Sequence, residues 1–187
     1  MCKKHVFLFC FATLLLSTVL AQIIPQSSAI PNATSVIIQP AAYNNTLKVN
    51  FVRTREAIAP IADISSFNTA GYTQVKEATQ YMDGLGRPLQ TVVKQASPQL
   101  KDLVSPVIYD EYGREKYNYL PFVSSAADGN FKLNPFSQQQ SFMQSQYTGE
   151  QVFYSITEYE ASPLNRVVKT MAAGNSWAGN GLSLIHI

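Results

Sequence analysis

The sequence predicts a mainly β fold made of short antiparallel hairpins with one packed helix. Apolar and polar residues alternate with a period of two in several short stretches, which is typical of strands with one buried face. Clusters of turn residues separate these stretches at the spacing of hairpins. A single longer stretch carries the start and stop signals of a helix instead. Together, these observations predict one β-rich domain.

The expected strands follow one another from Leu47 onward. The alternation is clear at the start, where Val49 and Phe51 flank Asn50, and it predicts a half-buried first strand. The stretch before it contains Pro25, Pro31 and Pro40 among small polar residues and is interpreted as an exposed linker. The expected strands are residues 47–52, 75–82, 89–94, 104–109, 115–119, 152–159 and 167–171.

The expected helix covers about residues 135–147. Asn134 is suited to cap its first turn, and Pro135 is suited to the first helical position. Phe136, Met143 and Tyr147 fall on one face of such a helix. We expect this face to pack on the sheet of the same domain, because a single apolar stripe usually serves the core. A helix that binds a partner is the alternative.

The first 21 residues have the features of a cleavable signal peptide. Lys3 and Lys4 precede an apolar run, and Val19-Leu20-Ala21 forms a small-residue cleavage site. The run is shorter than the roughly 20 residues that span a bilayer, so we expect export and no transmembrane anchor after cleavage. Removal of the two lysines leaves 12 basic and 12 acidic side chains. This balance gives no electrostatic reason to expect nucleic acid as a partner.

Cysteine and histidine are nearly absent from the expected mature chain. Both cysteines, Cys2 and Cys10, leave with the signal peptide, and His186 is the one remaining histidine. A disulfide, a cysteine nucleophile, a Ser-His-Asp triad and a zinc site of the usual ligands therefore lack their components. We expect no cofactor, no metal and no enzymatic activity. An acid pair such as Glu158 and Glu160 is set aside, because solvated strand carboxylates are far commoner than catalytic ones.

Two similar turns are the most informative motif. Both read Asp-x-x-Gly-Arg, and each precedes a strand-like stretch. The chemistry suits a hairpin turn, because aspartate bonds the backbone two residues on, glycine accepts positive φ, and the arginine can pair with the aspartate. A looser third copy runs from Tyr159-Glu160 to Asn165-Arg166. The turn residues singled out are Asp83, Gly84, Gly86 and Arg87 in the first turn and Tyr109, Asp110, Gly113 and Arg114 in the second.

A family resemblance rests on the second turn and on further short motifs. Residues 107–114, VIYDEYGR, resemble the Tyr-Asp repeat of RHS proteins. The wider succession resembles the uncharacterised domain that opens large secreted RHS (YD-repeat) proteins of Gram-negative bacteria. Its motifs are NFVRT (50–54), QYMDGLGRPLQT (80–91), YLPF (119–122), DGNFK (128–132), NPF (134–136), SPLNR (162–166) and GNSW (174–177).

The resemblance implies a non-catalytic segment of a larger secreted or cell-surface protein. RHS repeats wind as β-hairpins into a hollow shell that can enclose a variable C-terminal toxin, so the implied partners are downstream repeats and cargo of the same polypeptide. The tyrosines expected in the shell wall are Tyr81, Tyr109, Tyr117 and Tyr119. The predicted segments of the chain are a signal peptide (1–21), a Pro/Ser-rich linker (22–46), a β-rich domain (47–181) that the resemblance associates with RHS proteins, and a tail (182–187) that resembles translated adaptor sequence.

Two alternatives remain open at this point. The tail is expected to be non-native, and a genuine short C-terminus is the competing interpretation. The second alternative concerns function: the domain can instead be a secreted module that binds surface glycans. In that case exposed aromatic rings would stack on the apolar faces of sugars. The candidate rings are Tyr72, Tyr112, Tyr147 and Trp177.

Overall fold

The computed structural model describes residues 39–178 and 183–186. These residues form a mainly β fold with two antiparallel sheets and one α-helix, which confirms the predicted fold class. The predicted signal peptide, residues 22–38 of the predicted linker, and residues 182 and 187 of the predicted tail lie outside the described residues.

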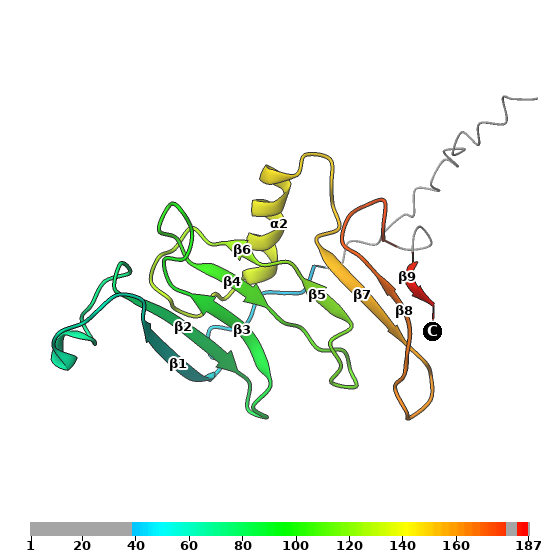
Figure 1. The fold of residues 1–187 in the computed structure, drawn as a ribbon. Helices are drawn as coiled ribbons and strands as arrows, with labels where there is room; N and C mark the ends of the chain where they lie inside the picture. The colour runs from blue at the N-terminus through cyan, green and yellow to red at the C-terminus, as the bar shows by residue number, and fades with distance from the viewer. Residues whose placement is uncertain (1–38, 179–182, 187) are drawn as a thin grey trace, which may run out of the picture. The chain divides into compact units, whose positions relative to one another are not determined.

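The strands of the two sheets are interleaved along the chain, because one strand of the second sheet precedes the last strand of the first sheet (Figure 1). The five-stranded sheet has the order β1-β2-β3-β4-β6, and the four-stranded sheet has the order β5-β7-β8-β9. A single bridge between Val107 and Asn118 marks the passage from the first sheet to the second. The strands are β1 (Asn50–Ala57), β2 (Val75–Met82), β3 (Pro88–Val93), β4 (Leu103–Pro106), β5 (Tyr117–Tyr119), β6 (Phe122–Val123), β7 (Tyr154–Tyr159), β8 (Val167–Met171) and β9 (Ser183–His186).

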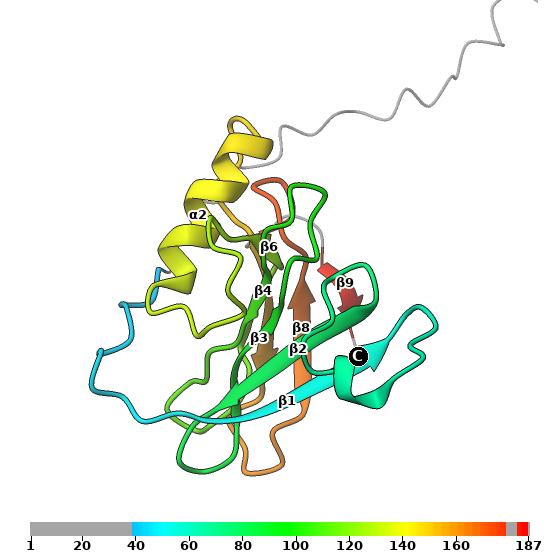
Figure 2. The same ribbon diagram turned by 90° about the vertical axis from the view of Figure 1, so that its left-hand side faces the viewer.

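Helix α2 (Pro135–Gln146) packs beside β4 and β6 (Figure 1, Figure 2). This arrangement confirms the expectation that the helix serves its own domain. Phe136 and Met143 are buried, but Tyr147 is exposed because it follows the last helical turn with non-helical backbone angles. Pro135 occupies the first turn as predicted. The capping prediction was wrong, because the side chain of Asn134 makes no capping hydrogen bond and only its carbonyl accepts the N–H of Gln138.

The core consists of two hydrophobic clusters. The first cluster lies on the five-stranded sheet and contains Tyr81, Val92, Val104, Phe122, Met143 and Phe153. The second lies beside the four-stranded sheet and contains Tyr119, Phe136, Val152, Tyr154 and Ala178. Helix α2 therefore contributes one of the buried side chains of each cluster. Tyr81 and Tyr119, two of the expected wall tyrosines, are buried, and Tyr109 and Tyr117 are half-buried.

The first strand departs from its prediction. β1 lies at the edge of its sheet, and its side chains are almost all exposed, including that of Phe51 at 57%. Alternation alone predicted a half-buried strand, but no other described layer covers β1. Tyr43, within the expected linker, contacts the rings of Phe131 and Phe136, and its N–H donates to the carbonyl of Leu133. The folded region therefore includes Tyr43 and does not begin at residue 47.

The other strands lie close to the predicted stretches, with shifts at their ends. β4 stops at Pro106 because the chain leaves the first sheet there, and β7 begins only at Tyr154 although Val152 and Phe153 are buried. The two-residue β6 and the strand β9 were not predicted. β9 pairs with β8 over residues expected to be a non-native tail. Backbone pairing does not depend on the origin of these residues, so that expectation stays a prediction.

A buried ion pair fixes the loop before the helix. The Lys132 ammonium lies 2.8 Å from a carboxylate oxygen of Asp102, and both side chains are buried. Burial alone lowers the pKa of Lys132, but hydrogen bonds to Asp102 and Asp128 outweigh it, and the net shift is upward. The buried amide of Gln90 holds the same loop through the backbone N–H and carbonyl of Lys132. The loop is thus tied to the sheet by paired polar groups.

Candidate functional site

The candidate site is built on the two predicted Asp-x-x-Gly-Arg turns. Turn 1 (residues 83–87) joins β2 to β3, and turn 2 (residues 110–114) lies between β4 and β5. In each, the aspartate N–H donates to the arginine carbonyl at 2.9 Å. One carboxylate oxygen accepts two backbone N–H groups, and the other accepts the arginine Nε at 2.8 Å. Gly86 and Gly113 have φ of 79° and 78°, so the predicted turn chemistry is present in both.

The looser third copy is also a turn of this kind. Turn 3 (residues 160–166) joins β7 to β8, and Glu160 takes the place of the aspartate. The N–H of Glu160 donates to the carbonyl of Arg166, and its carboxylate accepts the Arg166 Nε at 3.0 Å. Asn165 has a φ of 51°, so it fills the position that glycine fills in turns 1 and 2. Because Glu160 is engaged in this turn, it is not a free member of an acid pair with Glu158.

The three turn carboxylates share a lowered pKa. For Asp83 the main cause is the hydrogen bond from the Arg87 backbone, and for Glu160 it is the hydrogen bond from the Arg166 side chain. For Asp110, burial raises the pKa, but hydrogen bonds from the backbone and side chain of Arg114 outweigh it. Each carboxylate is therefore held in its charged form by the arginine that closes its own turn.

The three turns lie side by side along one edge of the two sheets, at the lower edge in Figure 1. Contacts between an arginine and a tyrosine join them in series. The Arg87 guanidinium of turn 1 lies over the ring of Tyr109, 4.6 Å from its centroid, and Tyr109 directly precedes turn 2. The Arg114 guanidinium of turn 2 lies 4.7 Å from the centroid of Tyr159, which directly precedes turn 3. We call this series of contacts the Arg–Tyr ladder.

Strand register explains why the ladder has this pattern. β3 pairs with β4 with Gln90 opposite Pro106, and this register places Arg87 level with Tyr109. β5 pairs with β7 with Tyr117 opposite Ile156, and this register places Arg114 level with Tyr159. In both cases the arginine that leaves one turn faces the tyrosine that enters the next. Directly opposed residues of antiparallel strands are the pairs that interact most strongly in a sheet.

Each ladder arginine also reaches the positive-φ residue of the next turn. A Cβ atom at Gly113 would lie 3.2 Å from Nη1 of Arg87, so the Arg87 side chain passes directly over this glycine. Nη1 of Arg114 donates to Oδ1 of Asn165 at 2.9 Å. The Arg114 guanidinium additionally lies over the exposed ring of Tyr112, 4.8 Å from its centroid. The same guanidinium therefore contacts turns 2 and 3.

The two turn glycines offer a matched test of this contact. Gly86→Ala is expected to cost about 1 kcal/mol of unfolding free energy, because alanine is strained at positive φ. Gly113→Ala has the same φ, and its Cβ would displace the Arg87 side chain, so we expect an additional loss of up to about 1 kcal/mol. Urea denaturation of both variants measures the difference. Equal losses would show that Arg87 moves aside without cost.

A groove of about 650 Å³ lies between turns 2 and 3. Its walls include the rings of Tyr112 and Tyr159 and the Arg114 side chain, and polar groups of Glu160, Ser162 and Asn165 complete them. Its volume lies within the range of about 300–1,000 Å³ that is usual for small-molecule sites. Aromatic rings beside hydrogen-bonding groups are an arrangement that can hold an uncharged polar ligand.

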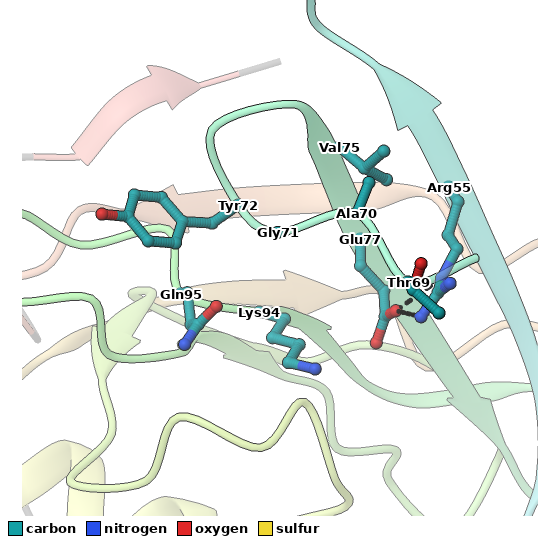
Figure 3. A pocket seen from close by; sticks show the side chains of 9 residues that line it. All are labelled: Arg55, Thr69, Ala70, Gly71, Tyr72, Val75, Glu77, Lys94 and Gln95. Atoms are coloured by element: carbon teal, nitrogen blue, oxygen red, sulfur yellow. Dashed lines mark hydrogen bonds and ion pairs between the residues drawn. The ribbon is translucent and has the colours of Figure 1, made fainter. Parts of the chain in front are cut away.

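A smaller cavity of about 210 Å³ lies beside β2 (Figure 3). The buried carboxylate of Glu77 accepts the Arg55 Nε at 2.7 Å, and Lys94 and Gln95 project from the neighbouring segment. Arg53 also approaches Glu77, with 3.6 Å between Nε and Oε1. The carboxylate thus serves to pair two guanidinium groups that project from β1. The cavity is below the usual size for a ligand site, so the groove between turns 2 and 3 is the better candidate.

Within residues 39–178 and 183–186, no group of three or more His, Cys, Asp or Glu side chains is placed to hold a metal ion. Among the helices that the structure describes, none is long and apolar enough to cross a membrane.

Sequence reasoning found the turns but missed the ladder. The aspartate and the arginine pair within each turn as predicted, in turn 1 through Asp83 and Arg87 and in turn 2 through Asp110 and Arg114. A Cβ atom added at Gly84 would have no neighbour within 4 Å, so no close contact requires glycine at this position. The contacts from Arg87 to Tyr109 and from Arg114 to Tyr159 were not predicted. Their signal in the sequence is the repeated order Tyr-acidic-turn-Arg, which holds at turns 2 and 3.

The fold and the turns define a mainly β domain organised around three serial turns, each closed by an acidic residue paired with an arginine. A family model matches residues 53–186, and the chain belongs to that family, which is described as Domain of unknown function (DUF6443). No curated protein and no solved structure matches the chain.

Proposed function

We propose that this chain is the non-catalytic N-terminal segment of a secreted or cell-surface RHS (YD-repeat) protein. In this role its hairpins contribute to a β-shell that encloses or displays a variable, toxin-like C-terminal cargo. The observation that carries the proposal is the Arg–Tyr ladder, which joins three successive acidic turns, the last two of them directly preceded by tyrosine, into a series. The motif VIYDEYGR at residues 107–114, which resembles the Tyr-Asp repeat, lies at the centre of this series.

The ladder supports a shell because it links each hairpin to the next one. Arg87 and Arg114 both make an ion pair within their own turn and a ring contact with the following turn. A unit of this kind can be repeated without a change in its chemistry, as in other arrays whose repeats contact only their neighbours. Serial pairing also leaves few free strand edges, which limits association with other chains.

The N-terminal sequence supports export of the protein. Lys3 and Lys4, the apolar run and the cleavage site at Ala21 together have the pattern of a cleavable signal peptide. An exported shell would meet its partners within its own polypeptide, namely the downstream repeats and the C-terminal cargo.

The groove between turns 2 and 3 favours a second candidate, a secreted module that binds glycans. Tyr112 is 71% exposed and lines the groove together with Tyr159 and hydrogen-bonding groups. The other rings considered for this role, Tyr72, Tyr147 and Trp177, are exposed but do not line this groove.

The experiment that tests the proposal is long-read determination of the coding sequence at this locus. A reading frame that continues into many Tyr-Asp repeats and a variable C-terminal region is the expected result. A stop codon directly after Ile187 would overturn the shell, and the glycan candidate would then be tested on a glycan array with Tyr112→Ala as the control.

A further inference from the structure

The Arg–Tyr ladder has a direction. Turn 1 is preceded by Met82 and not by tyrosine, and the residue opposite Met82 on β1 is Asn50. We call each contact between an arginine and the facing tyrosine a rung of the ladder. Turn 1 has neither a preceding tyrosine nor an arginine opposite that position, so no rung precedes it. Arg87 of turn 1 and Arg114 of turn 2 each contact a tyrosine of the next hairpin. Among the described residues the series thus begins at turn 1 and proceeds toward turn 3.

Within the described residues, the ladder ends at Arg166 of turn 3. The Nε and Nη2 atoms of Arg166 contact Glu160, as their counterparts in turns 1 and 2 contact aspartate. Its side chain is 71% exposed, compared with 39% for Arg87 and 22% for Arg114. Within the part of the chain that the structure describes, Arg166 lies over no aromatic ring. Arg166 therefore pairs with the acidic residue of its own turn, as Arg87 and Arg114 do, but it lacks their contact with a tyrosine of a following hairpin.

The outer edge of β8 accepts a strand in the orientation that a further rung needs. β9 pairs with β8 antiparallel and runs toward the edge that carries turn 3 (Figure 1). In this register Lys169 faces His186, and Arg166 lies three residues closer to the turn. A strand that continues along this register places its third residue after His186 level with Arg166.

We propose that Arg166 and the outer edge of β8 are the docking site for the next Tyr-acidic hairpin of the same polypeptide, whose tyrosine lies level with Arg166. The proposal rests on the proposed function and adds to it the residue and the register that receive the next repeat. The occupant follows from the two existing rungs, in which an arginine faces the tyrosine directly before an acidic turn. A guanidinium favours the face of such a ring.

The chain supplies its own test hairpin. Residues 108–119, appended directly after Ile187 of the full chain, place the copy of Tyr109 level with Arg166 in the β9 register. Residues 109–119, appended in the same way, shift this tyrosine by one position and turn it to the other face of the sheet. The two extensions differ by one residue and serve as a matched pair.

We expect the in-register extension to raise the folded-to-unfolded ratio about two- to fivefold relative to the shifted extension, as measured in urea. We also expect an upfield ring-current shift of the Arg166 side-chain resonances in that extension alone. Arg166→Ala and Arg166→Lys should abolish the gain, and both should fold because this side chain is exposed.

Equal stabilities of the two extensions, or a gain that survives Arg166→Ala, would overturn the docking site. A gain that depends on protein concentration would overturn it as well, because the occupant would then be a second copy of the chain. The outcome is independent of the coding sequence at the locus. A stop codon after Ile187 would therefore overturn the proposed function but leave the result of this measurement open. Failure of the docking site would likewise leave the proposed function open.

Discussion

Asp102→Ala is expected to cost about 3–5 kcal/mol of unfolding free energy, the largest effect of any single substitution considered for this protein. The Asp102 carboxylate is fully buried, and it accepts the Lys132 ammonium at 2.8 Å and the N–H of Gly129 at 2.8 Å. Its other oxygen accepts the N–H of Gln95 at 3.1 Å. Alanine would leave a buried cation and two backbone donors without these acceptors. Urea denaturation followed by circular dichroism measures the loss.

Asp128→Ala is the matched control for this prediction. Asp128 contacts the same ammonium at 2.6 Å, but its side chain is 51% exposed. Water can replace a carboxylate at such a position, so we expect a loss of at most about 1 kcal/mol. Similar losses for Asp102→Ala and Asp128→Ala would mean that water reaches Lys132 in both variants, and the buried pair would not be the main anchor of its loop.

Arg114→Ala is expected to cost about 2–3 kcal/mol, the second largest effect. The guanidinium pairs with Asp110, donates to Asn165 and lies over the rings of Tyr112 and Tyr159. Two ring contacts at about 0.5–1 kcal/mol each and about 1 kcal/mol for the hydrogen bonds account for this sum. Arg114→Lys should lose most of the same free energy, because an ammonium cannot form the two-pronged contact with the carboxylate and stack on the rings.

Arg87→Ala serves as the comparison for Arg114. Arg87 makes the same contacts within its turn, but it lies over only one tyrosine ring and its side chain is more exposed. Its loss should be smaller than that of Arg114→Ala in the same urea titration. A larger loss for Arg87→Ala would contradict the idea that Arg114 contributes more to the free energy of unfolding because it contacts two turns.

The turns could be predicted from the sequence because their interactions are local. Asp83 and Arg87 are four residues apart, and the aspartate, glycine and arginine within each turn determine its geometry without help from the rest of the chain. Asn165 takes the place of the turn glycine through similarly local chemistry, because asparagine also tolerates positive φ. The helix could be predicted for a similar reason, because Pro135 marks its start within the sequence.

The contacts between turns could not be predicted in this way. Arg87 meets Tyr109 only because β3 and β4 pair in one particular register, and that register is set by packing across the whole sheet. Lys132 and Asp102 are likewise brought together from distant loops, and their sequence context gave no sign of burial. The exposure of β1 could not be predicted either. Alternation of apolar and polar residues distinguishes the two faces of a strand, but it does not indicate whether another layer covers one of them. Membership of an RHS protein stays a prediction.

The position of α2 between the two hydrophobic clusters has a consequence for how the domain loses its structure. Phe136 belongs to one cluster and Met143 to the other, although both project from the same short helix. Fraying of this helix would open both clusters to water at once. We therefore expect the two sheets to unfold together as one cooperative unit.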